Sequence, residues 1–286
     1  MVLTWHTRPV QRPFRQVDVF GSEPFAGNPV AVVLDGSGLT AAQMQRIAHW
    51  MNLSETTFLL PADERGADYR VRIFTTATEL PFAGHPTLGT CHAWLEAGGR
   101  PASLDRIVQQ CGAGLVSIRR ASGLLSFEAP PRLRSGPVDE SLIADVARGL
   151  GIAREEIVDA QWADNGPGWI ALLLESADAV LALRPSFARG IEVGVAGPYP
   201  AGSECAIEVR AFFSQDDGWT EDPVTGSFNA SLAQWLVETG RAAVPYVASQ
   251  GTALGRRGRV HVSADESGAV WVGGTTVSMV SGSVEA

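Results

Sequence analysis

The sequence has 286 residues, of which 45% are hydrophobic and 19% are charged, and its formal net charge is −9 at pH 7. Length and composition favour a globular chain of one or two domains and exclude a largely disordered one. The acidic balance excludes the basic surface that sequence-independent nucleic-acid binding needs. No stretch approaches the ~18 consecutive apolar residues of a transmembrane helix. We therefore expect a cytoplasmic protein that binds neither nucleic acid nor membrane.

Local patterns predict the elements of the first half. Two β-branched runs, residues 17–20 and 29–34, predict strands that are joined by a turn-rich segment. The helical spacing of the apolar residues that follow predicts a helix, with Thr40 as its N-cap and Asn52 closing it in the left-handed conformation. Further strands are expected at residues 56–60 and 69–75.

A glycine-bearing turn then leads directly into a second predicted helix. The turn and helix start read ELPFAGHPTLGT, residues 79–90. Pro86 suits the first helical position, where its missing N–H is not needed, and Gly98 suits the position just after the last turn.

The same scheme returns late in the chain. Residues 221–241, EDPVTGSFNASLAQWLVETGR, predict a helix that Ser227 caps and Gly240 closes. Thirteen positions separate His85 from Gly98, and thirteen separate Ser227 from Gly240. Both helices end in Gly-Arg, and each is followed by a turn with Gln and Gly (QQCG and SQG) and a β-like run. This ordered repetition predicts a duplicated α+β unit and two similar domains.

The domain boundary is predicted within residues 127–137, where prolines and a glycine should break any element. We expect an N-terminal α+β domain over residues 1–130 and a C-terminal one over 131–286, and we allow for the last strand to return to the N-terminal domain. A helix at residues 138–151 and a strand at 169–175 open the second half.

Cysteines and histidines give no sign of a metal site. Three widely spaced cysteines, Cys91, Cys111 and Cys205, indicate free thiols in a reducing compartment. Single histidines (His49, His92 and His261) and the absence of phosphate-binding, dinucleotide-binding and zinc motifs lead us to expect no metal and no cofactor. The arginines of residues 254–260 are interpreted as a turn or solvated strand edge rather than a phosphate patch.

Three residues could carry chemistry, and each also has a plain structural interpretation. His85 could cap a helix, Asp222 could start a turn before Pro223, and Glu55 could be an exposed carboxylate at a strand edge. The two helix starts could bind a small carboxylate with their N–H groups and dipoles, or could simply be well-capped core helices. Four further carboxylates are interpreted as solvated: Glu79, Glu221, Asp216 and Asp217.

Several stretches resemble the phenazine-biosynthesis PhzF-like family over nearly the whole chain. They are VDVFGSEPFAGNPVAVVLD, NLSETTFLLP, RIFTTATELPFAGHPTLGT, EDPVTGSFNASLAQWL and SQGTALGRRGRV. The resemblance implies a fold like that of diaminopimelate epimerase. In that fold, two similar α+β domains each wrap a barrel-like, mostly antiparallel sheet around a central helix, and the active site lies in the cleft between them.

The resemblance also implies an activity. The characterised member of the family isomerises trans-2,3-dihydro-3-hydroxyanthranilate without a cofactor and is a homodimer. Carried over by motif, Glu55 is the proton-transferring residue, with His85 and Asp222 as its catalytic partners. The substrate-binding residues implied are Asn28, Ser54, Gly84, Thr225, Gly226 and Ser227, and the backbone donors among them would hold the substrate carboxylate.

Two features depart from known patterns. The cysteine-dependent epimerases of the same fold use two facing cysteines, whereas His85 and Asp222 occupy the corresponding motifs here, which disfavours a thiol mechanism. Phe228 adds bulk beside the carboxylate site, in a run that is plainer in the phenazine enzyme, and this departure leaves the particular substrate open.

These observations lead to three hypotheses. The first is a cofactor-independent isomerase that moves a proton on a small cyclic anionic metabolite, with Glu55 as acid and base. The second is a non-catalytic protein of the same fold that binds small anions or acts as a scaffold. The third is a hydrolase or lyase that uses the same glutamate.

Overall fold

The computed structural model describes residues 10–103, 105–186, 190–215 and 218–286. Asp216 and Asp217, predicted to be solvated, lie outside these residues. By its contacts the chain divides into two compact units, described separately below. Unit 1 comprises Met1–Val19, Pro29–Leu125 and Thr276–Ala286, and unit 2 comprises Phe20–Asn28 and Ser126–Thr275. The domain limits of 1–130 and 131–286 remain a prediction.

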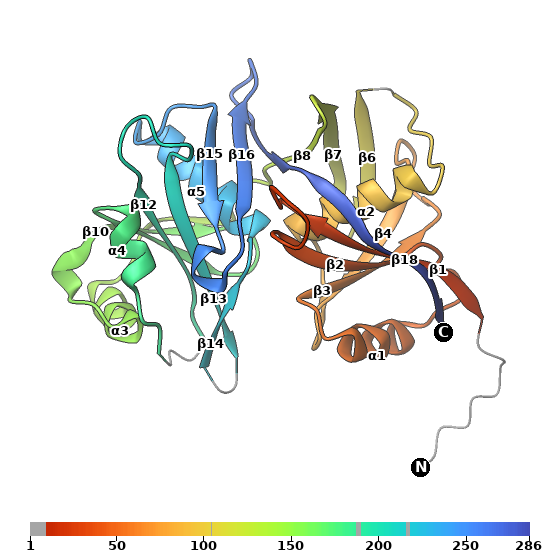
Figure 1. The fold of residues 1–286 in the computed structure, drawn as a ribbon, viewed down its shortest axis with the longest axis horizontal. Helices are drawn as coiled ribbons and strands as arrows, with labels where there is room; N and C mark the ends of the chain where they lie inside the picture. The colour runs from red at the N-terminus through yellow and green to blue at the C-terminus, as the bar shows by residue number, and fades with distance from the viewer. Residues whose placement is uncertain (1–9, 104, 187–189, 216–217) are drawn as a thin grey trace, which may run out of the picture. The chain divides into compact units, whose positions relative to one another are not determined.

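Within its described residues, unit 1 has two helices among its strands (Figure 1). In chain order the elements are β1 (Gln11–Val19), β2 (Asn28–Val33), α1 (Ala41–Met51), β3 (Glu55–Leu60), β4 (Tyr69–Phe74), β5 (Glu79–Leu80), α2 (Gly84–Glu96), β6 (Arg106–Cys111), β7 (Gly114–Ala121) and β18 (Thr276–Glu285). The last strand, β18, pairs antiparallel with β1 along its length. Strand β8 (Leu124–Glu128) contains the division between the units.

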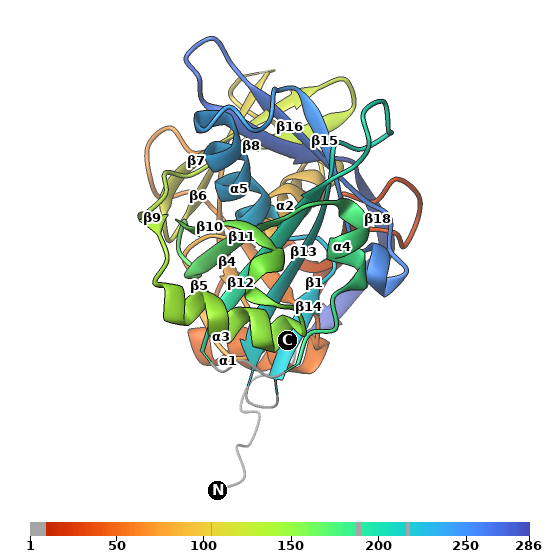
Figure 2. The same ribbon diagram turned by 90° about the vertical axis from the view of Figure 1, so that its left-hand side faces the viewer.

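In the part of unit 2 that the structure describes there are three helices and two short 3-10 turns (Figure 2). Its elements are β9 (Arg134–Pro137), α3 (Glu140–Leu150), η1 (Arg154–Glu156), β10 (Ile157–Asp164), β11 (Trp169–Leu174), α4 (Ala177–Ala182), β12 (Glu192–Pro198), β13 (Ile207–Gln215), β14 (Gly218–Asp222), α5 (Gly226–Glu238), β15 (Tyr246–Gln250), η2 (Thr252–Leu254), β16 (Gly258–Ala264) and β17 (Val270–Gly274). Among the helices of the described residues, none has the length and apolar character needed to cross a bilayer.

The two units repeat one pattern of strand pairing. In unit 1, β2–β3 and β4–β6 are parallel, while β3–β4, β4–β5 and β6–β7 are antiparallel. In unit 2, β11–β12 and β13–β15 are parallel, while β12–β13, β13–β14 and β15–β16 are antiparallel. Element for element, β2 to β7 correspond to β11 to β16, with α2 and α5 in equivalent places. The repetition that the sequence predicts is therefore present in the topology.

Helix α1 begins and ends where its sequence predicts. Thr40 accepts a bond from the backbone N–H of Gln43, whose side chain accepts one from the N–H of Thr40, so the two form a capping box. Asn52 closes the helix at φ 53° in the left-handed region. Met44 and Ala48 form the buried face, which packs in one core cluster with Phe58 and Phe74.

Helices α2 and α5 are the most buried helices of their units, because strands contact them on several sides. Helix α2 contacts β1, β3, β6 and β18, and α5 contacts β10, β16 and β17 (Figure 1). Gly98 and Gly240 follow the two helix ends with φ of 92° and 68°, as the sequence predicts. Tight packing of these helices is what fixes the residues at their first turns.

Both predicted helix starts are wrong by two residues. Helix α2 begins at Gly84, which places Pro86 at its third position, and α5 begins at Gly226 with Thr225 rather than Ser227 as N-cap. Neither N-cap residue makes a side-chain capping bond. The hydroxyl of Thr225 donates instead to Asp222 at 2.6 Å, so a tertiary contact replaces the local cap on which the prediction rested.

Residues 127–137 do not break every element. Arg134–Pro137 forms β9, which pairs antiparallel with β10. Proline has no backbone N–H, so it is tolerated at the end of a strand where no bond from that position is needed. Gly136, which precedes it, adopts φ 97°. The predicted helix and strand that open the second half are confirmed as α3 and β11.

Candidate functional site

Glu55 lies at the first position of β3, beside β2. The parallel register pairs Val30 of β2 with Glu55, and the glutamate is 9% exposed. It is therefore not the exposed strand-edge carboxylate of the plain interpretation. The next residues of β3, Thr56 and Thr57, are completely buried, and Thr57 accepts a bond from Thr90 of α2 at 2.8 Å. Strand and helix are thus joined directly behind the glutamate.

His85 is the second residue of α2 and meets Glu55 inside unit 1. Its Nε2 atom lies 3.3 Å from Oε2 of Glu55, and its side chain is 4% exposed. The ring also donates to the carbonyl of Pro29, since proline has no N–H to offer. Burial lowers the pKa of His85 to about 3, against a smaller raising effect of the Pro29 bond. The imidazole is therefore neutral at physiological pH.

A close helix–strand approach holds this pair together. A Cβ atom on Gly89 of α2 would lie 2.3 Å from Cγ1 of Val30 and 3.1 Å from Cγ2 of Val19. Only glycine fits there without displacing a buried valine. Because Val30 stands opposite Glu55 and follows Pro29, this contact sets the distance between α2 and both partners of His85.

Two further predicted residues of unit 1 flank the pair. Ser54 precedes Glu55 and is exposed, and Gly84 is buried at the first position of α2. The first helical bond at this start runs from Thr87 N to Ala83 O, so the ladder of α2 does not use the N–H of Gly84.

Asp222 is held by two side chains in unit 2. Its Oδ1 accepts from Nδ2 of Asn28 at 3.0 Å, and its Oδ2 accepts from the hydroxyl of Thr225 at 2.6 Å. Nδ2 of Asn28 also donates to the carbonyl of Val224 at 2.9 Å, and Asn28 is completely buried. The structure thus brings Asn28, Asp222 and Thr225 together, and each carboxylate oxygen has a fixed donor.

A second layer of amides, which the sequence patterns did not predict, supports this group. Gln250 donates from Nε2 to the hydroxyl of Thr225 at 2.9 Å and to the backbone carbonyl of Asp222 at 3.2 Å. Its Oε1 accepts from the N–H of Thr225 and from Nδ2 of Asn229. The SQG turn contained the signal, since Gln250 belongs to the motif that repeats in the two halves.

Gly226 and Ser227 form the first turn of α5. Ser227 is buried, its hydroxyl accepts from Nε1 of Trp169 at 3.2 Å, and its carbonyl accepts from Nδ2 of Asn165 at 2.8 Å. By element order, Ser227 takes the place of His85, and Glu192, the first residue of β12, takes the place of Glu55. Unit 2 therefore has a glutamate without the matching histidine.

The expectation for Phe228 is wrong. Its ring is completely buried and packs against Trp169, with a centroid distance of 5.3 Å. A Cβ on Gly194 would lie 2.0 Å from this ring, so the ring fills the space that the glycine leaves in the core. The Phe228 ring therefore points into the core of unit 2, where the space between Trp169 and Gly194 accommodates it.

The expectation for Glu221 is also wrong, whereas Glu79 is exposed as expected. Glu221 is 9% exposed and accepts two bonds from Arg210, at 3.0 and 2.7 Å. Arg210 also donates to the carbonyls of Val180 and Leu183, which ties α4 to the strand that leads to Asp222. Glu79 forms an exposed pair with Arg72.

Thiol and amine nucleophiles are disfavoured by the residues present. All three cysteines are free, and burial raises the pKa of Cys91 to about 12 and also raises the pKa of Cys111 and Cys205. None is a thiolate near neutral pH. The printed sequence contains no lysine, so it cannot form a lysine Schiff base.

Sequence comparisons place the chain among isomerases. A model of the phenazine biosynthesis-like protein family, PhzC-PhzF, matches residues 17–282. Antisense-enhancing sequence 1 of Schizosaccharomyces pombe is 35% identical over 95% of this chain and 98% of its own length. The trans-2,3-dihydro-3-hydroxyanthranilate isomerase of Pseudomonas aeruginosa is also 35% identical, over 88% and 90%. An uncharacterized isomerase of Pasteurella multocida is 31% identical, over 93% and 91%.

Solved structures agree on the fold. A PhzF-family protein from Bacillus anthracis superposes with a TM-score of 0.80 at 22% identity, covering 97% of this chain and 100% of that one. A hydroxyproline epimerase from Agrobacterium vitis superposes with a TM-score of 0.59 at 13% identity, covering 99% and 94%. The mixed α/β fold, mostly sheet with few helices, is thus shared with PhzF proteins and with this epimerase. The chain belongs to the phenazine biosynthesis-like (PhzC-PhzF) family and is an enzyme of its isomerase type.

Proposed function

We propose that this enzyme is a cofactor-independent isomerase that moves a proton on a small cyclic carboxylate of the dihydro-hydroxyanthranilate type, with Glu55 as the acid and base. The contact of Glu55 Oε2 with His85 Nε2 at 3.3 Å carries the proposal. The named activity of the Pseudomonas aeruginosa relative supports the substrate class.

The Glu55–His85 contact favours a single shared proton. Nε2 of His85 faces the glutamate, so we assign the N–H that bonds Pro29 to Nδ1. In the neutral ring Nε2 is then an acceptor, and so is an ionised carboxylate oxygen. Two acceptors at this distance repel each other unless a proton lies between them. A proton held by Glu55 and bonded to His85 makes the contact favourable.

This arrangement suits an isomerisation that takes a proton from one ring carbon and returns it to another. Glu55 enters this step ionised and accepts the C–H proton while the electrons of that bond enter the conjugated system, so the proton that it then shares with His85 is the one taken from the substrate. The protonated carboxyl group then delivers the proton to a second carbon, and no atom is gained or lost. A positioned acid/base of this kind supplies about 10²–10⁴-fold in rate. His85 keeps the carboxyl group oriented between the two steps.

Asp222 is proposed as the partner that orients polar groups of the substrate, because both of its oxygens are fixed by donors. The N–H groups at the starts of α2 and α5 are proposed to bind the carboxylate, as helix N-termini favour anions. An active site between the two domains, a homodimer and a cytoplasmic location likewise stay proposals that rest on the family resemblance.

Turnover in deuterium oxide tests the proposal. Wild-type enzyme is incubated with trans-2,3-dihydro-3-hydroxyanthranilate, and isomer formation and isotope incorporation are followed by mass spectrometry and NMR. We expect an isomer of unchanged mass in water and a loss of at least about 100-fold in kcat for Glu55→Gln. Glu79→Gln, at an exposed carboxylate of the same unit, is the matched control and should keep full activity.

Other outcomes identify the competing functions. Full activity of Glu55→Gln overturns the acid/base role. A product that has gained water or lost a fragment indicates a hydrolase or lyase. If wild type and Glu55→Gln bind trans-2,3-dihydro-3-hydroxyanthranilate with equal affinity in calorimetry and neither turns it over, the protein is a non-catalytic binder.

A further inference from the structure

The segment Phe20–Asn28, here called the arm, belongs by contacts to unit 2 although its neighbours in sequence belong to unit 1. Backbone bonds attach its start: Phe20 N donates to Thr275 O, and Arg259 N donates to Phe20 O, both at 2.8 Å. Its end carries Asn28, whose amide holds Asp222. The path of the arm therefore decides where the Asn28 amide lies.

Arg256 bonds the arm just before Asn28. Its Nη1 donates to the carbonyl of Phe25 at 2.8 Å and to that of Gly27 at 3.3 Å. Between these carbonyls, Ala26 O accepts from the backbone N–H of Arg257 at 2.8 Å. Phe25 is left-handed at φ 67°, a conformation that an aromatic residue adopts at a cost and that these bonds help to hold.

The other end of Arg256 is fixed beside Asp222. Its backbone N–H donates to Gly251 O at 2.9 Å. A Cβ on Gly251 would lie 2.6 Å from the carbonyl of Pro223 and 2.8 Å from Cβ of Arg256, so this turn packs against the residue that follows Asp222. Arg256 thus spans from the Asp222 turn to the arm.

We infer that Arg256 is a positioning residue: it fixes the arm so that the buried Asn28 amide holds the carboxylate of Asp222 in one orientation. The inference rests on the proposed function for its effect on turnover, but its structural part stands on the bonds alone. Because one guanidinium nitrogen bridges two carbonyls at a set spacing, lysine should replace it only in part.

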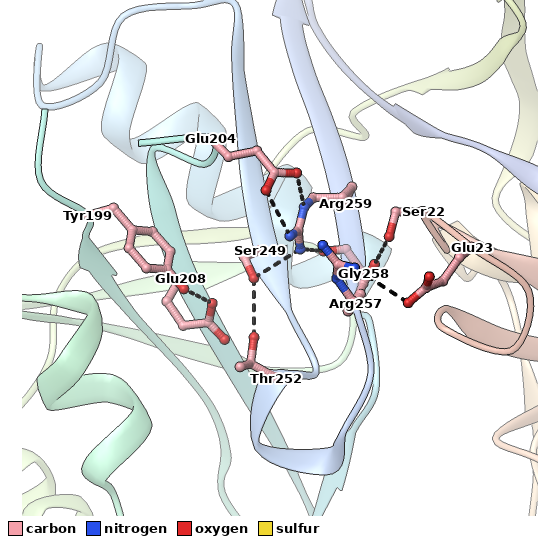
Figure 3. A network of polar contacts seen from close by, with 10 residues as sticks. All are labelled: Ser22, Glu23, Tyr199, Glu204, Glu208, Ser249, Thr252, Arg257, Gly258 and Arg259. Carbon is pink, nitrogen blue, oxygen red and sulfur yellow. Dashed lines mark hydrogen bonds and ion pairs between the residues drawn. The ribbon is translucent and has the colours of Figure 1, made fainter. Parts of the chain in front are cut away.

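The neighbouring Arg257 offers a matched control. Figure 3 shows its side chain facing Glu23 of the arm, with Nη1 and Oε1 3.5 Å apart. Both side chains are more than half exposed, and the bonds from the arm's Ser22 reach the backbone carbonyl of Arg257 (Figure 3). Arg257→Gln therefore removes a charge next to the arm without removing a bond near Asn28.

The first measurement is independent of catalysis. Hydrogen exchange of the arm amides is compared in wild type, Arg256→Gln, Arg256→Lys and Arg257→Gln. We expect exchange to rise by about 10-fold or more in Arg256→Gln, by less in Arg256→Lys and not in Arg257→Gln. Equal exchange in Arg256→Gln and wild type overturns the inference.

The second measurement is a double-mutant cycle with Asn28→Ala. If Arg256 acts through Asn28, the double variant Asn28→Ala/Arg256→Gln should match Asn28→Ala in kcat, whereas Arg256→Gln alone should lose about 10-fold in kcat with a smaller change in KM. Independent losses that multiply in the double variant overturn the inference.

The proposed function and the positioning role of Arg256 fail in different ways. Should wild type turn over no dihydro-hydroxyanthranilate, the proposed function fails, and the cycle is read from midpoints of thermal unfolding instead. The shifts of the two single variants should then sum to more than that of the double variant. Additive shifts overturn the role of Arg256 even if turnover is confirmed.

Discussion

Gln109 and Gln250 hold equivalent places in the two units. Each is completely buried on the strand that follows the central helix, and each donates from Nε2 to a threonine at that helix's start, at 2.9 Å. The threonines are Thr87 and Thr225. The repeated glutamine of the sequence therefore has a shared purpose, which is to fix the first turn from which each site residue projects.

Replacing Gln250 by leucine should destabilise the enzyme and lower its activity. The change leaves the N–H of Thr225 buried without its acceptor, at about 1–3 kcal/mol, and removes one of the two bonds of the Asn229 amide, which keeps its bond to the carbonyl of Thr225. Gln250→Glu keeps an acceptor but loses the donors to Thr225 and Asp222 and places a carboxyl group at a completely buried position, so it should destabilise the enzyme as well. Urea unfolding measures both, and equal stability of Gln250→Leu and wild type would contradict the role assigned to Gln250.

Gly89→Ala should move helix α2, and His85 with it, relative to Glu55. The new methyl group meets Val30 at 2.3 Å, and overpacking of this kind typically costs about 1–3 kcal/mol. Because α2 must shift, the Glu55–His85 contact changes and kcat should fall together with the unfolding temperature. Combining it with Val30→Ala makes room and should restore part of both.

A matched control is available in β18. No atom lies within 4 Å of a Cβ placed on Gly282. Gly282→Ala should therefore leave activity and stability near those of wild type. A loss as large as that of Gly89→Ala would show that the measured effect does not come from the contact with Val30.

Local signals explain which parts of the fold could be predicted. The capping box of Thr40, the left-handed Asn52 and the glycines after α2 and α5 are decided by neighbours in sequence, and the structure confirms them. The N-cap of α5 is decided by Asp222 reaching Thr225, and this tertiary bond has no signature in the helix itself.

Long-range partners explain what could not be predicted at the site. Glu221 looked solvated because its partner Arg210 lies on the neighbouring strand β13, eleven residues earlier. Phe228 was expected beside the carboxylate site, because the space beside Gly194 that its ring fills appears only when β12 packs against α5. Motif resemblance brought Glu55 and His85 together as candidates, but their distance depends on the packing of Gly89.

Arg210→Met should be among the most destabilising single changes in unit 2. It leaves the carboxylate of Glu221 buried without its partner, which typically costs about 3–5 kcal/mol. Adding Glu221→Leu removes the unpaired charge and should recover much of the loss. Arg154→Met, which breaks an exposed pair with Glu140, should change the unfolding free energy far less. Similar losses in the two single variants would contradict this account.

Glu192 should make stability fall as pH rises. Burial raises its pKa to about 7, partly offset by a bond from the N–H of Ser214. Between about 4.5 and 7 the folded state then binds more protons than the unfolded chain, so stability decreases with pH in that window. Glu192→Gln should gain about 1 kcal/mol relative to wild type at pH 8, a value reduced for partial solvent exposure. No gain at pH 8 would contradict the raised pKa.

His85 should act in the opposite direction. Burial lowers its pKa from 6.5 to about 3, so the unfolded chain binds a proton between these values that the folded state excludes. Stability that is fully present above pH 6.5 should therefore be lost as pH falls toward 3. Urea unfolding of wild type and His85→Gln from pH 5 to 8 measures the effect. The advantage of wild type over the variant should shrink on acidification, and a constant difference would show that the pKa of His85 is the same in the folded and unfolded states.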